Sequence, residues 1–594
     1  MPFVIDDDEA WWSAASQEMK TPWDFYRSAV DHKPPGVVWF YWLVDHLSPV
    51  ASDPRVVRVV YTGMTIVAAL VLGKIASKFQ EKKGQEASSV GWITAILFLI
   101  VTAIPSPKLL AGTADGLIVN LTIFGYGLAL LAEFPGVSLL GGMILGLALL
   151  IKQTAVFFCF PILLSAWPRK WSWKELSLFA LGSLMVVVPS IFSVGVEDFL
   201  YWTWTYPKEV LTTVRDQLFH SNLEMFESLA LFCVATFPLL FLMLKRAFKM
   251  RTLEWGQGLR DFRFLWLLSG MAAALLGKGL FLHYLLLFAP QFALLAAEAL
   301  CTEAVWPKRT LSWIGAQYVF GVLILTLPFS GIFWGTDLIY FGGLGRVMKA
   351  SLRPGERVLV WGGSALPLNY SGASHVTRFV LPRFAVAPYA TVKTREIFHR
   401  ELEDDVPDLV LDLHERGDNQ FNNPIESEPF VANLISSRGY RVYVSPSVPW
   451  AKFYFRNPPL EAGGLVEVKG PEQIRFSYSS FPEEQKSWMR LVDLGRQDGI
   501  SRLLEANWEL RAGVSLELLE RQGTSERMRI QAKALGGELR MLMNSSGVTS
   551  ALTNRIEKLV SDEEKSAGIR PIPLLSSAWW PSLALVELQP KAFR

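Results

Sequence analysis

Asp6-Asp7-Asp8-Glu9-Ala10-Trp11-Trp12 and Asp31-His32-Lys33-Pro34-Pro35-Gly36 lie one short loop apart near the start of the chain. The acidic residues offer carboxylates that act as a base or activate a nucleophile, and Lys33 offers a cation for a phosphate group. Pro34 and Pro35 fix the turn at that lysine, because each ring holds φ at about −65° and removes a hydrogen-bond donor. An acidic run alone is more often a solvated tail. The Lys-Pro-Pro turn after it favours a functional site.

The composition indicates a membrane protein with a soluble extension. The chain has 594 residues, of which 51% are hydrophobic and 19% charged. About 25% charged residues is typical of globular chains. The apolar excess lies before about residue 335, and ordinary composition follows. A net charge of +2 gives no argument for nucleic acid. Three scattered cysteines form neither a disulfide framework nor a metal-binding spacing, and we expect no metal and no other cofactor.

The first half contains apolar segments of roughly transmembrane length. We expect about ten spans, near 56–76, 90–105, 114–132, 137–151, 153–168, 175–194, 228–244, 264–281, 284–300 and 311–332. Two of them, 137–151 and 153–168, are shorter than the ~20 residues that a straight span requires. Residues 37–47 are apolar but interrupted by Asp45 and His46, which predicts an interfacial helix.

Lysine and arginine residues alternate between the predicted loops. One set of loops is rich in them, at Lys74 to Lys83, Arg169 to Lys174, Lys245 to Arg263 and Lys308 to Arg309. Basic short loops face the cytoplasm. The acidic segment and everything after about residue 335 are therefore predicted on the extracytoplasmic side.

Several polar residues fall at span ends on that same predicted side. They are Asp115, Lys152, Lys278, His283 and Tyr284. Charges at membrane depth are costly unless they pair or line a cavity, which makes such residues functional candidates. The alternative is that the lysines extend to the interface as ordinary flanking residues. Their shared side with the acidic segment favours the functional interpretation.

The second half predicts a small α/β domain. Strands are expected at 357–363, 407–413 and 440–444, with helices at 344–352, 394–403 and 430–438. Alternating strands and helices favour a parallel sheet. No third glycine and no helix start follow Gly362-Gly363, so a nucleotide site there is improbable. Beyond 457, alternation at 527–534 and 538–543, with Gly536-Gly537 between them, predicts a hairpin. The expected domains are 1–55, 56–335, 336–456 and a β-containing 457–594 of unassigned role.

The two opening segments resemble the first extracytoplasmic loop of the polytopic GT-C glycosyltransferases, the superfamily of protein O-mannosyltransferases and lipid A aminoarabinose transferases. The resemblance continues in Thr113-Ala114-Asp115-Gly116-Leu117, in the run Gly141 to Ala155 and in the run His283 to Ala297. It covers roughly residues 5–335, and many bacterial members carry an α/β tail like the one predicted here. The order of these motifs and their common side make the match fairly specific.

The resemblance implies an enzyme that moves a hexosyl or pentosyl group from a polyprenyl-phosphate donor to an extracytoplasmic glycan, lipid or protein. Asp8 matches the catalytic base, and Glu9 is its partner. Lys33 matches the lysine that holds the lipid phosphate. Further candidates for the donor phosphate are Lys278, His283 and Tyr284, and the remaining candidates are Asp7, Asp115, Lys152 and His32. Relatives often have Arg-Tyr where this chain has His283-Tyr284, and a histidine carries charge only when protonated.

The chemistry of such a transfer agrees with these roles. Positive charge develops on the sugar ring and negative charge on the departing phosphate, and a carboxylate and lysines stabilise both without a metal. One base in a single displacement predicts inversion, since retention requires a second carboxylate as the nucleophile. Related chains begin with a transmembrane helix before the acidic loop. We therefore expect the start of this chain to lie upstream of Met1.

Two other classes of function stay open. A transporter or lipid flippase also places charges at span ends, but no clear internal repeat of helices is visible. A catalytically inactive relative acting in cell-envelope assembly is the other class. The sequence predicts a multi-pass protein of the inner or plasma membrane with an extracytoplasmic C-terminal half. It identifies neither the donor sugar nor the acceptor.

Overall fold

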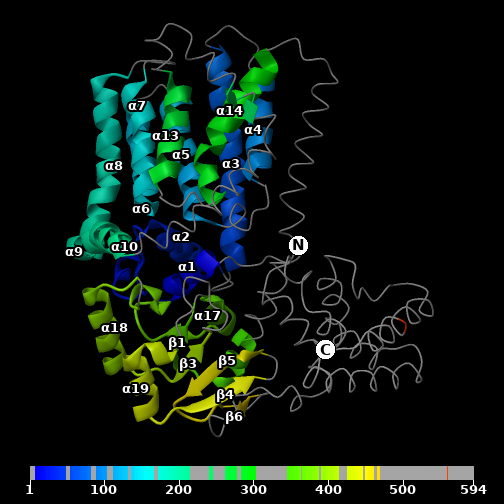
Figure 1. Cartoon of the computed structure of the whole chain (residues 1–594). Coiled ribbons are helices and arrows are strands. Elements are labelled where there is room, and N and C mark those ends of the chain that lie inside the picture. Colours follow the sequence, from blue (N-terminus) through cyan, green and yellow to red (C-terminus); the bar gives the residue numbers. More distant parts are fainter. Residues whose placement is uncertain are drawn as a thin grey trace. The chain divides into compact units, whose positions relative to one another are not determined.

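A computed structural model describes most of the N-terminal three quarters of the chain (Figure 1). The described residues are 7–48, 54–81, 88–102, 112–131, 135–165, 171–213, 240–241, 243–244, 261–276, 282–302, 344–362, 364–386, 389–413, 425–445, 448–460, 465–467 and 558. The chain divides into two units, the first comprising Met1–Tyr443 and Trp450–Gly463 and the second Val444–Pro449 and Gly464–Arg594. The predicted hairpin at 527–543 lies outside the described residues.

The acidic segment forms a helix where we expected a loop. Helix α1 spans Asp7–Glu18, and the 3-10 turn η1 spans Pro22–Asp24. Carboxylates in the first turn favour a helix because they complement the positive end of its dipole. Ala10, Ala14 and Trp12 of α1 are buried. The predicted interfacial helix is confirmed as a helix, α2, at Gly36–Leu47.

The apolar half is helical throughout its described residues. Its elements are α3 (Pro54–Glu81), α4 (Ser88–Thr102), α5 (Ala114–Leu131), α6 (Pro135–Ile151), η2 (Gln153–Cys159), α7 (Phe160–Leu164), α8 (Trp173–Val194), α9 (Val196–Leu200), the π-helix η3 (Tyr201–Thr205), α10 (Tyr206–Thr213), α13 (Phe262–Leu276), η4 (Leu282–Phe288) and α14 (Ala289–Thr302). Among the described residues, α3, α5 and α8 are long and apolar enough to cross a membrane. The predicted span at 311–332, and most of that at 228–244, lie outside the described residues.

Close approach of helices α6 and α8 depends on glycine. A Cβ added to Gly142 would lie 2.0 Å from the carbonyl oxygen of Phe179, and one added to Gly182 would lie 2.1 Å from that of Leu139. Small residues let helix backbones approach closely, which is how membrane helices pack. Figure 1 shows α6 and α8 side by side.

One basic residue that we assigned to a cytoplasmic loop is instead part of a buried ion-pair network. Arg263 pairs with Asp261 and, across to α14, with Glu298. Arg263 is 3% exposed and Glu298 is fully buried. A buried arginine needs such partners, because an uncompensated charge away from water is costly. Arg263 is therefore no evidence for membrane orientation.

The α/β part follows the predicted order of elements. Its elements are a helix at 344–351, β1 (Arg357–Trp361), α17 (Leu366–Ser371), β2 (Ser374–His375), η5 (Pro382–Phe384), α18 (Val392–Asp404), β3 (Leu409–Asp412), η7 (Ile425–Ser427), α19 (Pro429–Ser437), β4 (Arg441–Ser445), β5 (Val448–Phe455) and β6 (Val466–Glu467). A short helix, α17, does begin after Gly362-Gly363, contrary to expectation.

The sheet is mixed, whereas we predicted a parallel one. Strand β1 pairs in parallel with β2 and β3, but β3 pairs antiparallel with β5, for example Leu411 opposite Phe453. Only two residues separate β5 from β4, which is too few for the crossover that a parallel pair requires. The prediction missed β5 because Pro446 and Pro449 flank its start and weaken a strand pattern.

Candidate active site

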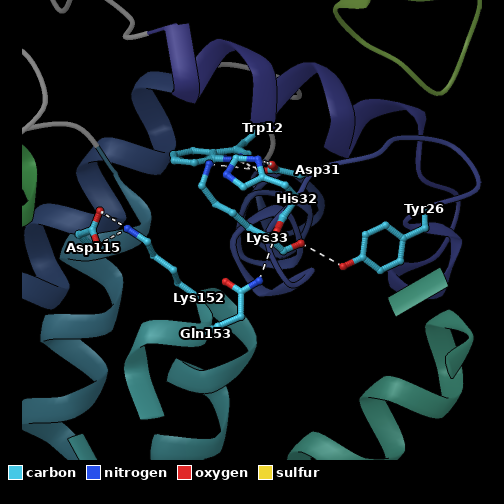
Figure 2. Close-up of polar contacts among 8 residues, drawn as sticks. All are labelled: Trp12, Tyr26, Asp31, His32, Lys33, Asp115, Lys152 and Gln153. Carbon is cyan, nitrogen blue, oxygen red and sulfur yellow. Dashed lines mark hydrogen bonds and ion pairs between the residues drawn. The ribbon is translucent and has the colours of Figure 1, made fainter. Parts of the chain in front are cut away.

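Asp31, His32 and Lys33 form a compact charged cluster between α1 and α2 (Figure 2). Asp31 Oδ1 lies 2.8 Å from His32 Nδ1, and its Oδ2 lies 3.5 Å from Lys33 Nζ. Trp12 of α1 donates its indole N–H to Asp31 Oδ2 at 3.4 Å. The buried Asp31 carboxylate therefore positions both the imidazole and the ammonium group.

The electrostatics of this cluster fix its protonation state. Burial raises the pKa of Asp31, but the charges of Lys33 and His32 outweigh it and hold that pKa far below its ordinary value. Burial lowers the pKa of His32, against the opposing pull of Asp31. These opposing effects keep the Asp31 carboxylate ionised at neutral pH and disfavour the protonated form of His32.

The backbone before Lys33 is held in a strained conformation. Tyr26 has φ of 68°, a left-handed value that a bulky residue seldom adopts. Its hydroxyl donates to the carbonyl oxygen of Lys33 at 3.0 Å, as Figure 2 shows. Strain of this kind persists where surrounding contacts impose it, often at functional sites. Lys33 itself lies with its ammonium 5.3 Å from the centre of the Trp12 ring.

A second charged cluster joins Asp115 of α5 to Lys152, which lies between α6 and η2. Lys152 Nζ donates to both carboxylate oxygens of Asp115, at 2.9 and 3.2 Å. The same ammonium lies 3.9 Å from the centre of the Tyr284 ring, a cation–π contact. Both charged side chains are about nine-tenths buried or more. Three of the predicted site residues thus lie together.

Gln153 connects the two clusters. Its side-chain amide donates to the carbonyl oxygen of His32 at 3.3 Å and to that of Thr203 at 3.0 Å. Because Gln153 follows Lys152 directly in the chain, the Asp115–Lys152 pair lies next to the Asp31–His32–Lys33 cluster (Figure 2). We call the two clusters together the charged centre.

Glu9 takes a position that favours a structural role. Its carboxylate, fully buried, accepts from Arg58 Nε at 2.9 and 2.8 Å, and it accepts from the backbone N–H of Gly112 at 2.8 Å. Asp8, by contrast, is half-buried. The side chain of Asp7 is outside the described residues.

Only some of the other predicted phosphate ligands are among the described residues. His283 and Tyr284 belong to η4, and the side chain of Tyr284 is buried against Lys152. The side chain of His283 and all of Lys278 lie outside the described residues. Their predicted roles stay predictions.

The α/β part contacts the segment that carries the charged centre, a contact that no sequence pattern predicted. The backbone carbonyl oxygen of Arg378 accepts a hydrogen bond from the backbone N–H of Val30 at 3.0 Å. The guanidinium of Arg378 donates to the carbonyl oxygen of Tyr26, also at 3.0 Å. Asn369 donates to the carbonyl oxygen of Ala10 at 2.6 Å. More than 340 residues separate these partners, so no local pattern could have found them.

Two residues of η5 extend this contact to the charged centre. The Phe384 ring lies 6.0 Å from that of His32 and 5.9 Å from that of Tyr206. Its neighbour is Arg383. Within the described residues, no group of three or more His, Cys, Asp and Glu side chains has the arrangement of a metal site. What the charged centre offers is lysines held against carboxylates, an arrangement suited to an anionic substrate.

Comparison with known proteins gives a likeness of fold. No protein-family model and no curated protein match the chain. ArnT from Cupriavidus metallidurans in the apo state is similar, with a TM-score of 0.50 and 12% identity, over 76% of this chain and 94% of that one. The chain is therefore similar to ArnT in fold.

Two further solved structures are less similar. One is ArnT from the same organism bound to undecaprenyl phosphate, with a TM-score of 0.48, 12% identity and coverage of 69% and 89%. The other is the oligosaccharyltransferase of Archaeoglobus fulgidus in complex with zinc and sulfate, with a TM-score of 0.42, 14% identity and coverage of 92% and 83%.

Proposed function

We propose that this protein is a membrane glycosyltransferase that moves a sugar from a polyprenyl-phosphate donor to an extracytoplasmic acceptor. The observation that carries the proposal is the charged centre, in which Lys33 and Lys152 come from distant segments and are each held against a buried carboxylate. Gln153 joins the two. The ArnT-like fold supports it, and ArnT itself has been crystallised with undecaprenyl phosphate.

The reaction is a single displacement at the anomeric carbon. The Asp8 carboxylate takes the proton of the acceptor hydroxyl as its oxygen forms the new bond to that carbon. The bond from the carbon to the phosphate oxygen breaks, and its electron pair leaves with the polyprenyl phosphate. Lys33 stabilises the charge that develops there, and attack from the opposite face inverts the configuration. Lysines perform this neutralisation directly, so we propose that transfer proceeds in the presence of a metal chelator.

Other residues support this reaction by adding positive charge near the phosphate or by holding their neighbours in place. Lys152 contributes positive charge next to the cluster of Lys33, and Tyr284 holds that ammonium by its ring. His283 and Lys278 are proposed to contact the donor phosphate as well. Glu9 acts through the fold, because its carboxylate is occupied by Arg58 and Gly112.

We further propose that the charged centre faces the extracytoplasmic side. Contacts between Val30 and Arg378, and between Ala10 and Asn369, support a common side for the opening segment and the α/β part. The bias of lysine and arginine among the loops supports the outer side.

The test uses the purified full-length protein in lipid nanodiscs with a panel of radiolabelled polyprenyl-phosphate sugars and a crude envelope acceptor. Loss of label from one donor, abolished in Lys33→Ala and in Asp8→Asn, is the expected result. Lys208→Ala and Asp404→Asn remove the same charges at exposed positions and serve as matched controls.

Three outcomes would contradict the proposal. They are the absence of consumption for every donor, equal activity of the Asp8→Asn variant, and movement of intact donor across the bilayer without transfer. The last outcome would indicate a flippase.

A further inference from the structure

Arg383, in the short turn η5 of the α/β part, differs from other arginines near it. Its Nε atom is buried and has no hydrogen-bond partner in the described part of the chain. The contact it does make is with the ring of its own neighbour Phe384, 4.9 Å away. By comparison, the guanidinium of Arg378 binds Glu401 and the carbonyl oxygen of Tyr26.

An unpaired buried donor is costly to the fold. Leaving a buried N–H without an acceptor costs about 1–3 kcal/mol, and more for a charged group. Arg58 and Arg263, the buried arginines of the helical part, both bind carboxylates. A guanidinium kept half-buried without such a partner is arranged for an acceptor that the described part of the chain does not supply.

The position of Arg383 identifies where that acceptor binds. Phe384 lies against His32, and so η5 borders the Asp31–His32–Lys33 cluster. The charge of Arg383 also contributes to lowering the pKa of Asp31 and that of His32, after burial and the nearer charges. The guanidinium is therefore within electrostatic reach of Lys33 and its partners.

The charges of this region sum in a way that specifies the ligand. Asp31 lies against Lys33, so this ion pair contributes no net charge. Arg383 is always protonated and leaves the region with one net positive charge. A polyprenyl-phosphate sugar is a phosphodiester with one negative charge. Without Arg383 the cluster that we assign to the donor phosphate would be neutral.

We propose that Arg383 binds the phosphate of the lipid-linked donor beside Lys33, so that the α/β part supplies a donor-binding residue to the charged centre. This inference rests on the proposed function. A planar guanidinium donates two parallel hydrogen bonds to phosphate oxygens, which a lysine cannot do. When the sugar leaves, the phosphate becomes a monoester and gains negative charge, and Arg383 stabilises that charge as it develops.

The experiment compares Arg383→Gln and Arg383→Lys with wild type in nanodiscs. Arg395→Gln is the matched control, because Arg395 is exposed on α18 of the same part. We measure the KM for donor, the KM for acceptor, and binding of undecaprenyl phosphate alone. Loss of a charged hydrogen bond predicts a donor KM and an undecaprenyl phosphate Kd about 10- to 100-fold higher in Arg383→Gln. Arg383→Lys should recover only part of each, and the acceptor KM should stay unchanged.

The outcomes separate this inference from the function on which it rests. If wild type binds undecaprenyl phosphate and consumes a donor, but Arg383→Gln does both equally well, the inference is wrong and the function stands. A rise in acceptor KM alone would assign Arg383 to the acceptor and would also overturn the inference. If wild type neither binds the lipid phosphate nor consumes any donor, the proposed function itself has failed. Thermal unfolding of each variant identifies a folding defect, which we do not expect because Arg383 Nε has no partner to lose.

Discussion

The buried ion pair of Glu9 and Arg58 permits a test of whether Glu9 has a structural role while Asp8 acts as the base. Glu9 lies next to Asp8, the proposed base, yet its carboxylate binds Arg58 and the N–H of Gly112. The perturbation is the set Glu9→Gln, Arg58→Met and the double variant. Glutamine keeps an oxygen for the Gly112 N–H and removes only the charge.

The magnitude follows from burial. The side chain of Glu9 is fully buried and that of Arg58 is 6% exposed. Removing one partner of a buried ion pair leaves an uncompensated charge, which costs about 3–5 kcal/mol. Removing both leaves none, so the double variant should be more stable than Arg58→Met. Breaking the exposed pair Arg353–Glu356 with Glu356→Gln is the control, and should cost less than about 1 kcal/mol.

The assay has two readouts on each variant. The free energy of unfolding is measured by denaturant titration in mixed micelles, and donor consumption is measured per folded molecule. We expect the double variant to regain both stability and most of the activity. A double variant that folds as well as wild type but is as inactive as Asp8→Asn would refute the structural assignment of Glu9. Single variants that lose less than about 1 kcal/mol would refute the argument from burial.

Three other predictions follow from the structure. Lys152→Met should destabilise the fold by about 3–5 kcal/mol by removing the buried charge that pairs with Asp115. The further change Asp115→Asn should restore unfolding stability but not transfer, measured by the same two assays. Burial lowers the pKa of His32 in the folded chain, so the unfolded chain binds a proton there more readily. The free energy of unfolding should therefore fall as the pH drops below about 6.5. The His32→Gln variant should flatten that part of a curve of unfolding free energy against pH. Gly142→Ala should cost about 1–3 kcal/mol by pushing α8 away from α6, whereas Gly63→Ala, with open space around its Cβ position, should cost nothing measurable by denaturant titration.

Much of the fold was predictable because it depends on short-range pattern. Apolar length located the helices α3, α5 and α8, and a run of buried residues located β1 and β3. The helix α1 was missed because acidic residues look alike in a solvated tail and in the first turn of a helix. The antiparallel strand β5 was missed because its start contains proline.

The candidate site was predictable in part. The resemblance pointed to Lys33, Asp115 and Tyr284, and a charge at a span end pointed to Lys152. Asp115, Lys152 and Tyr284 do lie together. The sequence predicted Glu9 as the partner of Asp8 and not as the partner of Arg58, because Arg58 lies 49 residues away. No sequence pattern singled out Arg383 or Phe384, because the contact of Phe384 with His32 joins segments that lie hundreds of residues apart.

The hydrogen bonds between the opening segment and the α/β part impose an order on biosynthesis. The hydrogen-bond partner of Ala10 is Asn369, 359 residues further along the chain, and that of Tyr26 is Arg378, 352 residues further along. These parts of the opening segment therefore reach their final environment only after the segment around residues 369–378 has been made, since contacts of such long sequence separation form late. A nascent chain that has not yet made η5 also lacks the contact of Phe384 with His32. A chain that ends before η5 lacks these contacts, and under the proposed function we expect it to be inactive.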